Sequence, residues 1–142
     1  MKNILIDAGP IIALFDKDDS YHETVLVFME KFKGHLYTTW PVITEVTHML
    51  SFNPKVQVLF LEWLMRDALN IINLEKPQIA RIMHLINKYS DLPMDLADSS
   101  LVVIAEMKGI TEIITIDSDY FVYRLKGNKM LKNVLNLDKC NK

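Results

Sequence analysis

Short apolar runs alternate along this chain with longer segments in which apolar residues recur every three or four positions. The short runs are rich in isoleucine, leucine and threonine, and several end at turn-forming or polar residues, which predicts buried strands. Four such runs are well defined and a fifth is weaker: 2–7, 35–39, 69–74, 111–117 and, as the fifth, 133–137.

The segments between these runs have the periodicity of amphipathic helices. Strands that alternate with helices predict an α/β fold, here a three-layer α/β/α sandwich with a mostly parallel sheet of about four to five strands. We expect residues 1–142 to form a single domain, because we find no repeat or linker. The predicted helices cover 10–17, 18–34, 40–52, 54–68, 76–90 and a last segment that begins near Asp95 and ends at Gly109.

The composition is that of a globular chain, since half of the 142 residues are hydrophobic and 24% are charged. No apolar run approaches the roughly 20 residues that a membrane span needs, so we expect no membrane partner. Asp7 and Pro10 interrupt the apolar N-terminal stretch, which argues against a signal peptide. A single cysteine, Cys140, cannot form an internal disulfide, and this agrees with a cytoplasmic location.

The net charge of −2 gives no global sign of nucleic-acid binding, but the basic residues are unevenly distributed. From Phe121 onward six basic residues face one acid, Asp138. This segment has two interpretations, a contact with substrate phosphates or a solvated surface, and the sequence leaves both open. The basic residues are Arg124, Lys126, Lys129, Lys132, Lys139 and Lys142.

Four acidic residues are candidates for one site. Asp7 and Asp117 end the first and fourth predicted strands, and open parallel sheets bind ligands beyond the carboxyl ends of their strands. Glu45 follows the second strand on a predicted helix. Each of the three also has an ordinary interpretation, as a turn residue, a helix cap or a solvated helix position.

A pair of aspartates at the start of the last helix, Asp95 and Asp98, raises the same question. An aspartate before a helix commonly caps it, which is worth about 0.5–2 kcal/mol. Residues three apart lie on neighbouring parts of a helix surface, so Asp95 can cap the helix while Asp98 faces the crevice. If Asp7, Glu45, Asp98 and Asp117 converge, their repulsion requires protonation or a cation. An all-oxygen set suits Mg²⁺ or Mn²⁺.

Three stretches resemble the motifs of PIN-domain nucleases, in the expected order: ILIDAGPIIALFDKDD, PVITEV and DLPMDLADSSLVVIAEMKGITEIITIDSDYF. The likeness extends from Asp7 to Phe121 and is greatest to VapC-type toxins of type II toxin–antitoxin modules. It implies Mg²⁺- or Mn²⁺-dependent endonucleolytic cleavage of RNA, often by homodimers, and a cognate antitoxin protein that binds at or near the site.

Transferred by position, the resemblance makes Asp7, Asp98 and Asp117 the metal ligands and Glu45 the fourth catalytic acid. Two further acids, Asp95 and Asp119, are accessory candidates. Arg124 is a candidate contact for substrate phosphate. Ser99 departs from the family pattern, in which alanine is common at this position.

Two other functions remain as alternatives. The first is a catalytically idle PIN-like module that binds RNA or protein, which would need no divalent cation for its interaction. The second is a phosphotransfer or receiver domain that uses Asp7 as the phosphorylated carboxylate. The stretch DAGP after the first strand offers no second acid, which argues against this last hypothesis.

Overall fold

Five parallel strands form one sheet in the computed structural model, which describes residues 1–135 and 137. The strand order is β3-β2-β1-β4-β5, so the chain starts in the centre, extends to one edge and then returns to build the other. The order therefore reverses at β1, where α/β sheets open a crevice at the carboxyl ends of the strands. The strands are β1 (Lys2–Ile6), β2 (Gly34–Thr38), β3 (Asn70–Ile71), β4 (Glu112–Ile114) and β5 (Lys132–Asn133).

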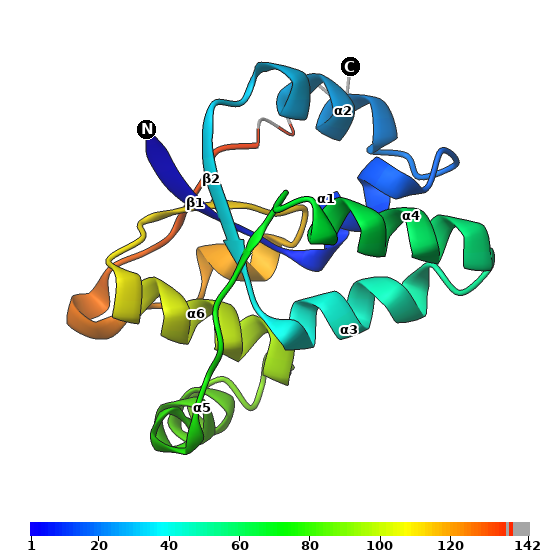
Figure 1. The fold of residues 1–142 in the computed structure, drawn as a ribbon. Helices are drawn as coiled ribbons and strands as arrows, with labels where there is room; N and C mark the ends of the chain where they lie inside the picture. Colours follow the sequence, from blue (N-terminus) through cyan, green and yellow to red (C-terminus); the bar gives the residue numbers. More distant parts are fainter. Residues whose placement is uncertain (136, 138–142) are drawn as a thin grey trace.

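The α-helices pack against both faces of this sheet. Figure 1 shows α5 and α6 on one side of β1 and β2 and α2 on the other, which confirms the predicted α/β layers. Helix α3 contacts both α1 and α6. The α-helices among the described residues are α1 (Ala8–Phe15), α2 (His22–Lys31), α3 (Trp40–Met49), α4 (Pro54–Met65), α5 (Lys76–Lys88) and α6 (Leu96–Lys108).

Two element boundaries at the carboxyl edge of the sheet follow from side-chain hydrogen bonds. Asp7 ends β1 because its carboxylate accepts the N–H of Ala8 at 2.8 Å and caps α1. Asp95 caps α6 in a similar way, since its carboxylate accepts the N–H of Asp98 at 2.8 Å. Gly109 ends α6 in the left-handed conformation with φ of 67°, which glycine adopts without a Cβ clash.

Several elements are shorter than the sequence pattern predicts. The run 69–74 contributes only Asn70–Ile71 to the sheet, and the run 111–117 only Glu112–Ile114. Strand β4 stops early because the Asn133 side chain takes over the pairing: its Oδ1 accepts the Thr115 N–H at 3.2 Å and its Nδ2 donates to the Thr115 carbonyl at 2.9 Å.

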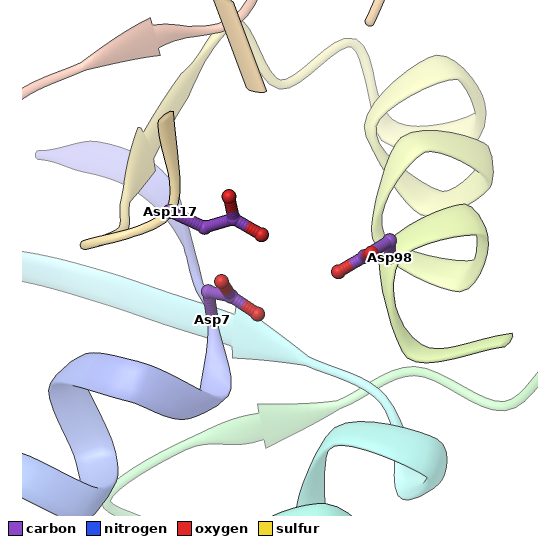
Figure 2. Close-up of side chains that lie close together, drawn as sticks. All are labelled: Asp7, Asp98 and Asp117. Atoms are coloured by element: carbon purple, nitrogen blue, oxygen red, sulfur yellow. The ribbon is translucent and has the colours of Figure 1, made fainter. Parts of the chain in front are cut away.

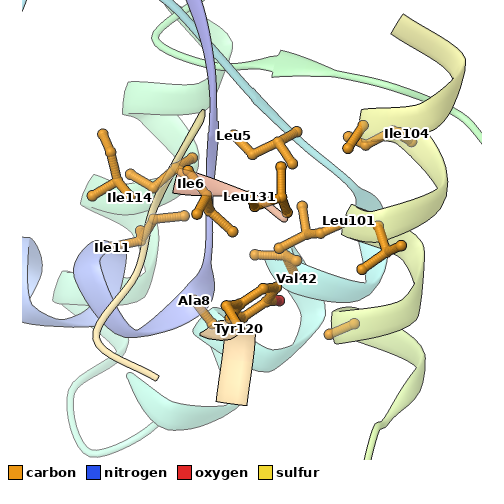
Figure 3. Close-up of a cluster of buried hydrophobic side chains, with 14 of the residues drawn as sticks. Leu5, Ile6, Ala8, Ile11, Val42, Leu101, Ile104, Ile114, Tyr120 and Leu131 are labelled. Atoms are coloured by element: carbon orange, nitrogen blue, oxygen red, sulfur yellow. The ribbon is translucent and has the colours of Figure 1, made fainter. Parts of the chain in front are cut away.

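The apolar core lies between the sheet and the helices (Figure 3). Leu5 and Ile6 of β1, with Leu101 and Ile104 of α6, have no exposed surface. Burying one such side chain stabilises the fold by about 1.5–3 kcal/mol. The segment of α6 from 97 to 105 is buried throughout, so the start of this helix is held firmly against the sheet.

No helix in the described part of the chain is long and apolar enough to cross a membrane. Four residues discussed above lie outside the described residues: Asp138, Lys139, Cys140 and Lys142.

Candidate active site

Three aspartates meet at the carboxyl edge of the sheet, where its strand order reverses. Asp7 directly follows β1, Asp117 lies three residues after β4, and Asp98 is the third residue of α6. One carboxylate oxygen of each lies within 4.8 Å of the others, and Figure 2 shows the three side chains pointing toward one another from three separate elements. The fold thus brings together groups that are up to 110 positions apart in the chain, from Asp7 to Asp117.

Thr115 connects two of these aspartates. Its hydroxyl donates to Asp7 Oδ2 at 2.9 Å and accepts the N–H of Asp117 at 3.0 Å. Asp7 Oδ1 meanwhile accepts the N–H of Ala8, so both of its carboxylate oxygens have a fixed donor. The Thr-x-Asp sequence at the end of β4 therefore sets the orientation of Asp7 as well as the position of Asp117.

Two buried tyrosines hold the third aspartate. The Tyr120 hydroxyl donates to Asp98 Oδ1 at 3.3 Å and the Tyr123 hydroxyl to Asp98 Oδ2 at 3.4 Å. The rings meet edge to face with centroids 5.2 Å apart. Burial raises the pKa of both phenols above the ordinary value, and the nearby carboxylates add to this. Both hydroxyls are therefore protonated donors at neutral pH.

Burial also raises the pKa of the Asp7 carboxyl to about 7, although its hydrogen bonds to Ala8 and Thr115 act in the opposite direction. The pKa of Asp98 rises to about 7 for the same main reason, with further repulsion from Asp95, Asp7 and Asp117. A carboxyl with so high a pKa is destabilised when ionised, and a cation in contact with it relieves that cost.

Glu45 lies on α3, beside the three aspartates but outside the group whose oxygens are within 4.8 Å. It is half-buried, and its pKa is raised by burial and then by repulsion from Asp95 and Asp117. Its charge in turn raises the pKa of Asp7. Glu45 therefore shares the electrostatic field of the cluster from a more distant position.

The two accessory candidates have structural roles or peripheral positions. Asp95 is exposed and caps α6. Asp119 follows Asp117, whose carboxylate accepts the Asp119 N–H at 2.9 Å and so opens the short 3₁₀ helix at Ser118–Phe121. Burial and the charge of Asp117 raise the pKa of Asp119.

Arg124 is engaged locally. Its Nη1 donates to the carbonyls of Phe121, Val122 and Tyr123 at 2.6–3.1 Å, which stabilises the turn after the 3₁₀ helix. Its contact with substrate phosphate stays a prediction.

The donor set fits a hard divalent cation. It consists of carboxylate oxygens alone, and such ligands suit Mg²⁺, Ca²⁺ or Mn²⁺ better than metals that prefer nitrogen or sulfur. None of the three aspartates forms a salt bridge within the described residues, where the ion pairs are Lys2–Glu112 and Arg81–Glu106. Asp7, Asp98 and Asp117 could hold such an ion between them.

Sequence reasoning missed the groups that position the aspartates. Thr115 lies inside the third motif stretch, and no sequence pattern marks Tyr120 or Tyr123 as site residues. The tyrosines follow Asp117 by three and six positions, a spacing typical of one helical face, but nothing in the sequence shows that this face meets α6. Ser99, the departure from the family pattern, donates within α6 to the carbonyls of Asp95 and Leu96 and is fully buried.

The chain is similar to known proteins over most of its length. It is 23% identical over 120 residues to Ribonuclease VapC26 of Mycobacterium tuberculosis (strain ATCC 25618 / H37Rv), covering 83% of this chain and 89% of that protein. Among solved structures it resembles Mycobacterium tuberculosis VapC20, a sarcin-ricin loop cleaving toxin, with a TM-score of 0.77 at 14% identity, covering 84% of this chain and 93% of that one.

A second solved structure, VapBC2 from Rickettsia felis bound to a DNA fragment from its promoter, gives a TM-score of 0.62 at 14% identity, covering 92% and 98% of the two chains. These structural likenesses support the fold. The PIN domain model matches residues 4–126, a range that includes all three clustered aspartates and Glu45. The chain therefore belongs to the PIN domain family.

Proposed function

We propose that this protein is a metal-dependent endoribonuclease that cleaves RNA phosphodiester bonds and acts as the toxin of a type II toxin–antitoxin module. The observation that carries the proposal is the cluster of Asp7, Asp98 and Asp117, the first two of them buried, at the reversal point of the sheet in a PIN domain. VapC26, which is a ribonuclease by name, supports the choice of RNA as substrate.

In this mechanism Asp7, Asp98 and Asp117 would hold Mg²⁺ or Mn²⁺, and such an ion would supply polarisation of the phosphate and activation of water. Thr115 and the two tyrosines keep the carboxylate oxygens in place. Glu45, half-buried on α3 beside the cluster, would orient the attacking water and accept its proton. The water oxygen bonds to phosphorus while the bond from phosphorus to the leaving nucleotide oxygen breaks, and that oxygen takes a proton from solvent.

The toxin assignment implies an antitoxin and a dimer. The likeness to VapBC2, which was solved bound to a DNA fragment from its promoter, supports the first. For a protein–protein surface we propose α4, on which Val58, Leu59, Leu61 and Met65 are exposed while only Phe60 is buried. Exposed apolar patches of this kind commonly mark protein contacts. An RNA substrate also agrees with the cytoplasmic location that the sequence suggests.

Cleavage of single-stranded RNA by the purified protein tests the proposal, with EDTA, Mg²⁺ and Mn²⁺ compared. We expect cleavage only with a divalent cation, and a loss of more than about 100-fold for Asp7→Asn, because the ligand charge is removed. Asp18→Asn is the matched control, since Asp18 is an exposed aspartate away from the site. Full activity of Asp7→Asn would contradict the proposal.

The idle binding module predicts a different result. Such a protein would bind RNA or a protein partner equally well in EDTA and in Mg²⁺ and would cleave nothing. The raised pKa of Asp7 and Asp98 argues against it, because a binding module gains nothing from burying uncompensated carboxylates.

A further inference from the structure

A cavity lies along the same edge of the sheet as the acidic cluster. It has a volume of about 610 Å³, within the range of small-molecule sites. Its walls come from the residues that follow β2 and β3, whereas Asp7 and Asp117 follow β1 and β4. Since the strand order is β3-β2-β1-β4 and neighbouring strands are about 4.8 Å apart, the cavity begins roughly 5–10 Å from the cluster.

Helix α6 forms part of both sites. Leu96, its first residue, lines the cavity, and Asp98 two positions later faces the cluster. The hydroxyls of Thr39 and Ser100 lie 2.6 Å apart and fix the end of β2 to α6. Figure 2 shows the segment from β2 into α3 passing below the start of α6. The cavity and the acidic cluster therefore lie on either side of the first turn of α6, which both of them use.

An exposed tryptophan stands at this cavity. Trp40 is 53% exposed, and its indole Nε1 donates to Asn73 Oδ1 at 3.1 Å, which holds the ring. Ile79 and Leu96, also on the cavity wall, are 49% and 53% exposed. Aromatic rings with apolar neighbours are the usual stacking surfaces for unpaired bases.

The groups around the cavity favour a negatively charged ligand that also carries hydrogen-bonding groups. Three helices begin at the cavity, α3 at Trp40, α5 at Lys76 and α6 at Leu96, and helix N-termini carry partial positive charge. Lys76 adds a full charge. Asn73 and Glu75 offer acceptors and a donor to the edge of a base, although Glu75 also opposes the positive charge.

We propose that this cavity, with Trp40 as its stacking surface, binds one unpaired nucleobase of the RNA next to the scissile phosphate. The inference rests on the proposed ribonuclease function and adds to it a determinant of substrate choice. A nucleobase fits better than a protein partner, because the exposed apolar side chains here line a cavity bounded by polar groups. The exposed apolar residues of α4, which are Val58, Leu59, Leu61 and Met65, offer a separate surface for a protein.

The test measures binding of a short labelled single-stranded RNA in Ca²⁺, which takes oxygen ligands as Mg²⁺ does. Trp40→Ala should weaken binding by roughly 5- to 150-fold, the range for loss of one stacked base, while Trp40→Phe keeps part of the affinity. Phe52→Ala, which removes an aromatic ring that is 60% exposed outside the cavity, is the matched control and should bind as the wild type does.

An RNA series with a single abasic nucleotide locates the base. At one position beside the cleavage point the abasic RNA should bind the wild type as weakly as intact RNA binds Trp40→Ala, and the two changes together should cost no more than either alone. In a Trp63→Phe background, in which Trp40 is the remaining tryptophan, RNA should quench the fluorescence saturably.

Two results would overturn the inference directly: Trp40→Ala binds RNA with wild-type affinity, or every abasic RNA loses the same affinity. A third is a Trp40→Ala variant whose sedimentation changes while its RNA binding does not, since the cavity would then be a protein interface. The proposed function fails separately. Trp40-dependent binding without cleavage in Mg²⁺ refutes the ribonuclease, whereas normal cleavage by Trp40→Ala refutes only the base site.

Discussion

Asp7 and Asp98 are buried carboxyl groups whose pKa is raised to about 7 in the protein without a bound cation. In the unfolded chain their pKa returns to about 3.9. Between these values the native protein holds protons that the unfolded chain has lost. Proton linkage then makes the free energy of unfolding fall as the pH rises.

We therefore predict that the metal-free protein loses stability as the pH rises from about 4 to about 7. Protonated Asp7 and Asp98 contribute fully to the free energy of unfolding below this window, and the contribution is lost above it. Mg²⁺ should raise the melting temperature more at about pH 8 than at about pH 6, because protons compete with the ion at low pH. Thermal melts in EDTA and in Mg²⁺ measure both effects. A Mg²⁺ shift that is independent of pH would contradict the assignment of these carboxyls.

Asp98→Asn should stabilise the metal-free protein at about pH 8 by on the order of 1 kcal/mol. The amide keeps the shape of the side chain without a buried charge, and solvent at the site limits the gain. Urea denaturation in EDTA measures the change. Mg²⁺ should raise the stability of the variant less than that of the wild type. A variant less stable than the wild type in EDTA would show that Asp98 has a structural role.

Tyr120 and Tyr123 should matter through Asp98. Replacing either by phenylalanine removes one donor to its carboxylate, and loss of such a partner typically weakens metal binding 10- to 100-fold. Because these contacts are 3.3 and 3.4 Å long, we expect about tenfold for each variant. The Mg²⁺ concentration that gives half-maximal cleavage measures this weakening of metal binding. A lower maximal rate with unchanged Mg²⁺ dependence would rule out this positioning role.

Helix α6 is the element that connects fold and site, since its buried face packs on the sheet while its first turn presents Asp98. Asp95 caps this turn. Asp95→Ala should lower the free energy of unfolding by about 1 kcal/mol, and Asp95→Asn by much less, because asparagine caps equally well. Urea denaturation of the two variants compares them directly. Equal losses would show that the charge of Asp95 matters rather than the cap.

For the helices and strands, the sequence predicted the type and order of the elements well, and their ends less well. Gly109 ends α6 as its position suggested, and Asp95 caps it. The run 69–74 looked like a full strand, yet only Asn70–Ile71 pairs with β2. Length at a sheet edge depends on the neighbouring strand rather than on local pattern. The end of β4 also depends on a distant residue, because the Asn133 side chain forms the hydrogen bonds to the Thr115 backbone that a neighbouring strand would otherwise form.

The part of the site that lies at strand ends was predictable from the sequence. Asp7 and Asp117 followed apolar runs, so the parallel-sheet rule placed them at one edge, and the structure brings them together with Asp98. Glu45 was grouped with them and lies slightly apart. Tyr120 and Tyr123 reach Asp98 only because the segment that follows Asp117 packs on α6, which is a tertiary feature without a local signal.

The exposed apolar face of α4 is the surface of the molecule that we expect to mediate self-association. We predict that the protein forms a homodimer through this face, and that Leu59→Asp shifts it toward the monomer, because an uncompensated charge opposes burial. Sedimentation of wild type and variant at equal concentration provides the measurement. Met83→Asp, an exposed apolar position on α5, is the control. A wild type that sediments as a monomer would leave α4 to the antitoxin and contradict the dimer.

If Asp7, Asp98 and Asp117 form a metal site that cleaves RNA, the two aspartates at the start of α6 must respond differently to substitution. The measurement is Mn²⁺ binding by calorimetry, with RNA cleavage recorded on the same preparations, for wild type, Asp98→Asn and Asp95→Asn. We predict that Asp98→Asn loses both, while Asp95→Asn binds Mn²⁺ and cleaves RNA within a few-fold of the wild type. Retention of both by Asp98→Asn, or their loss in Asp95→Asn alone, would contradict the account.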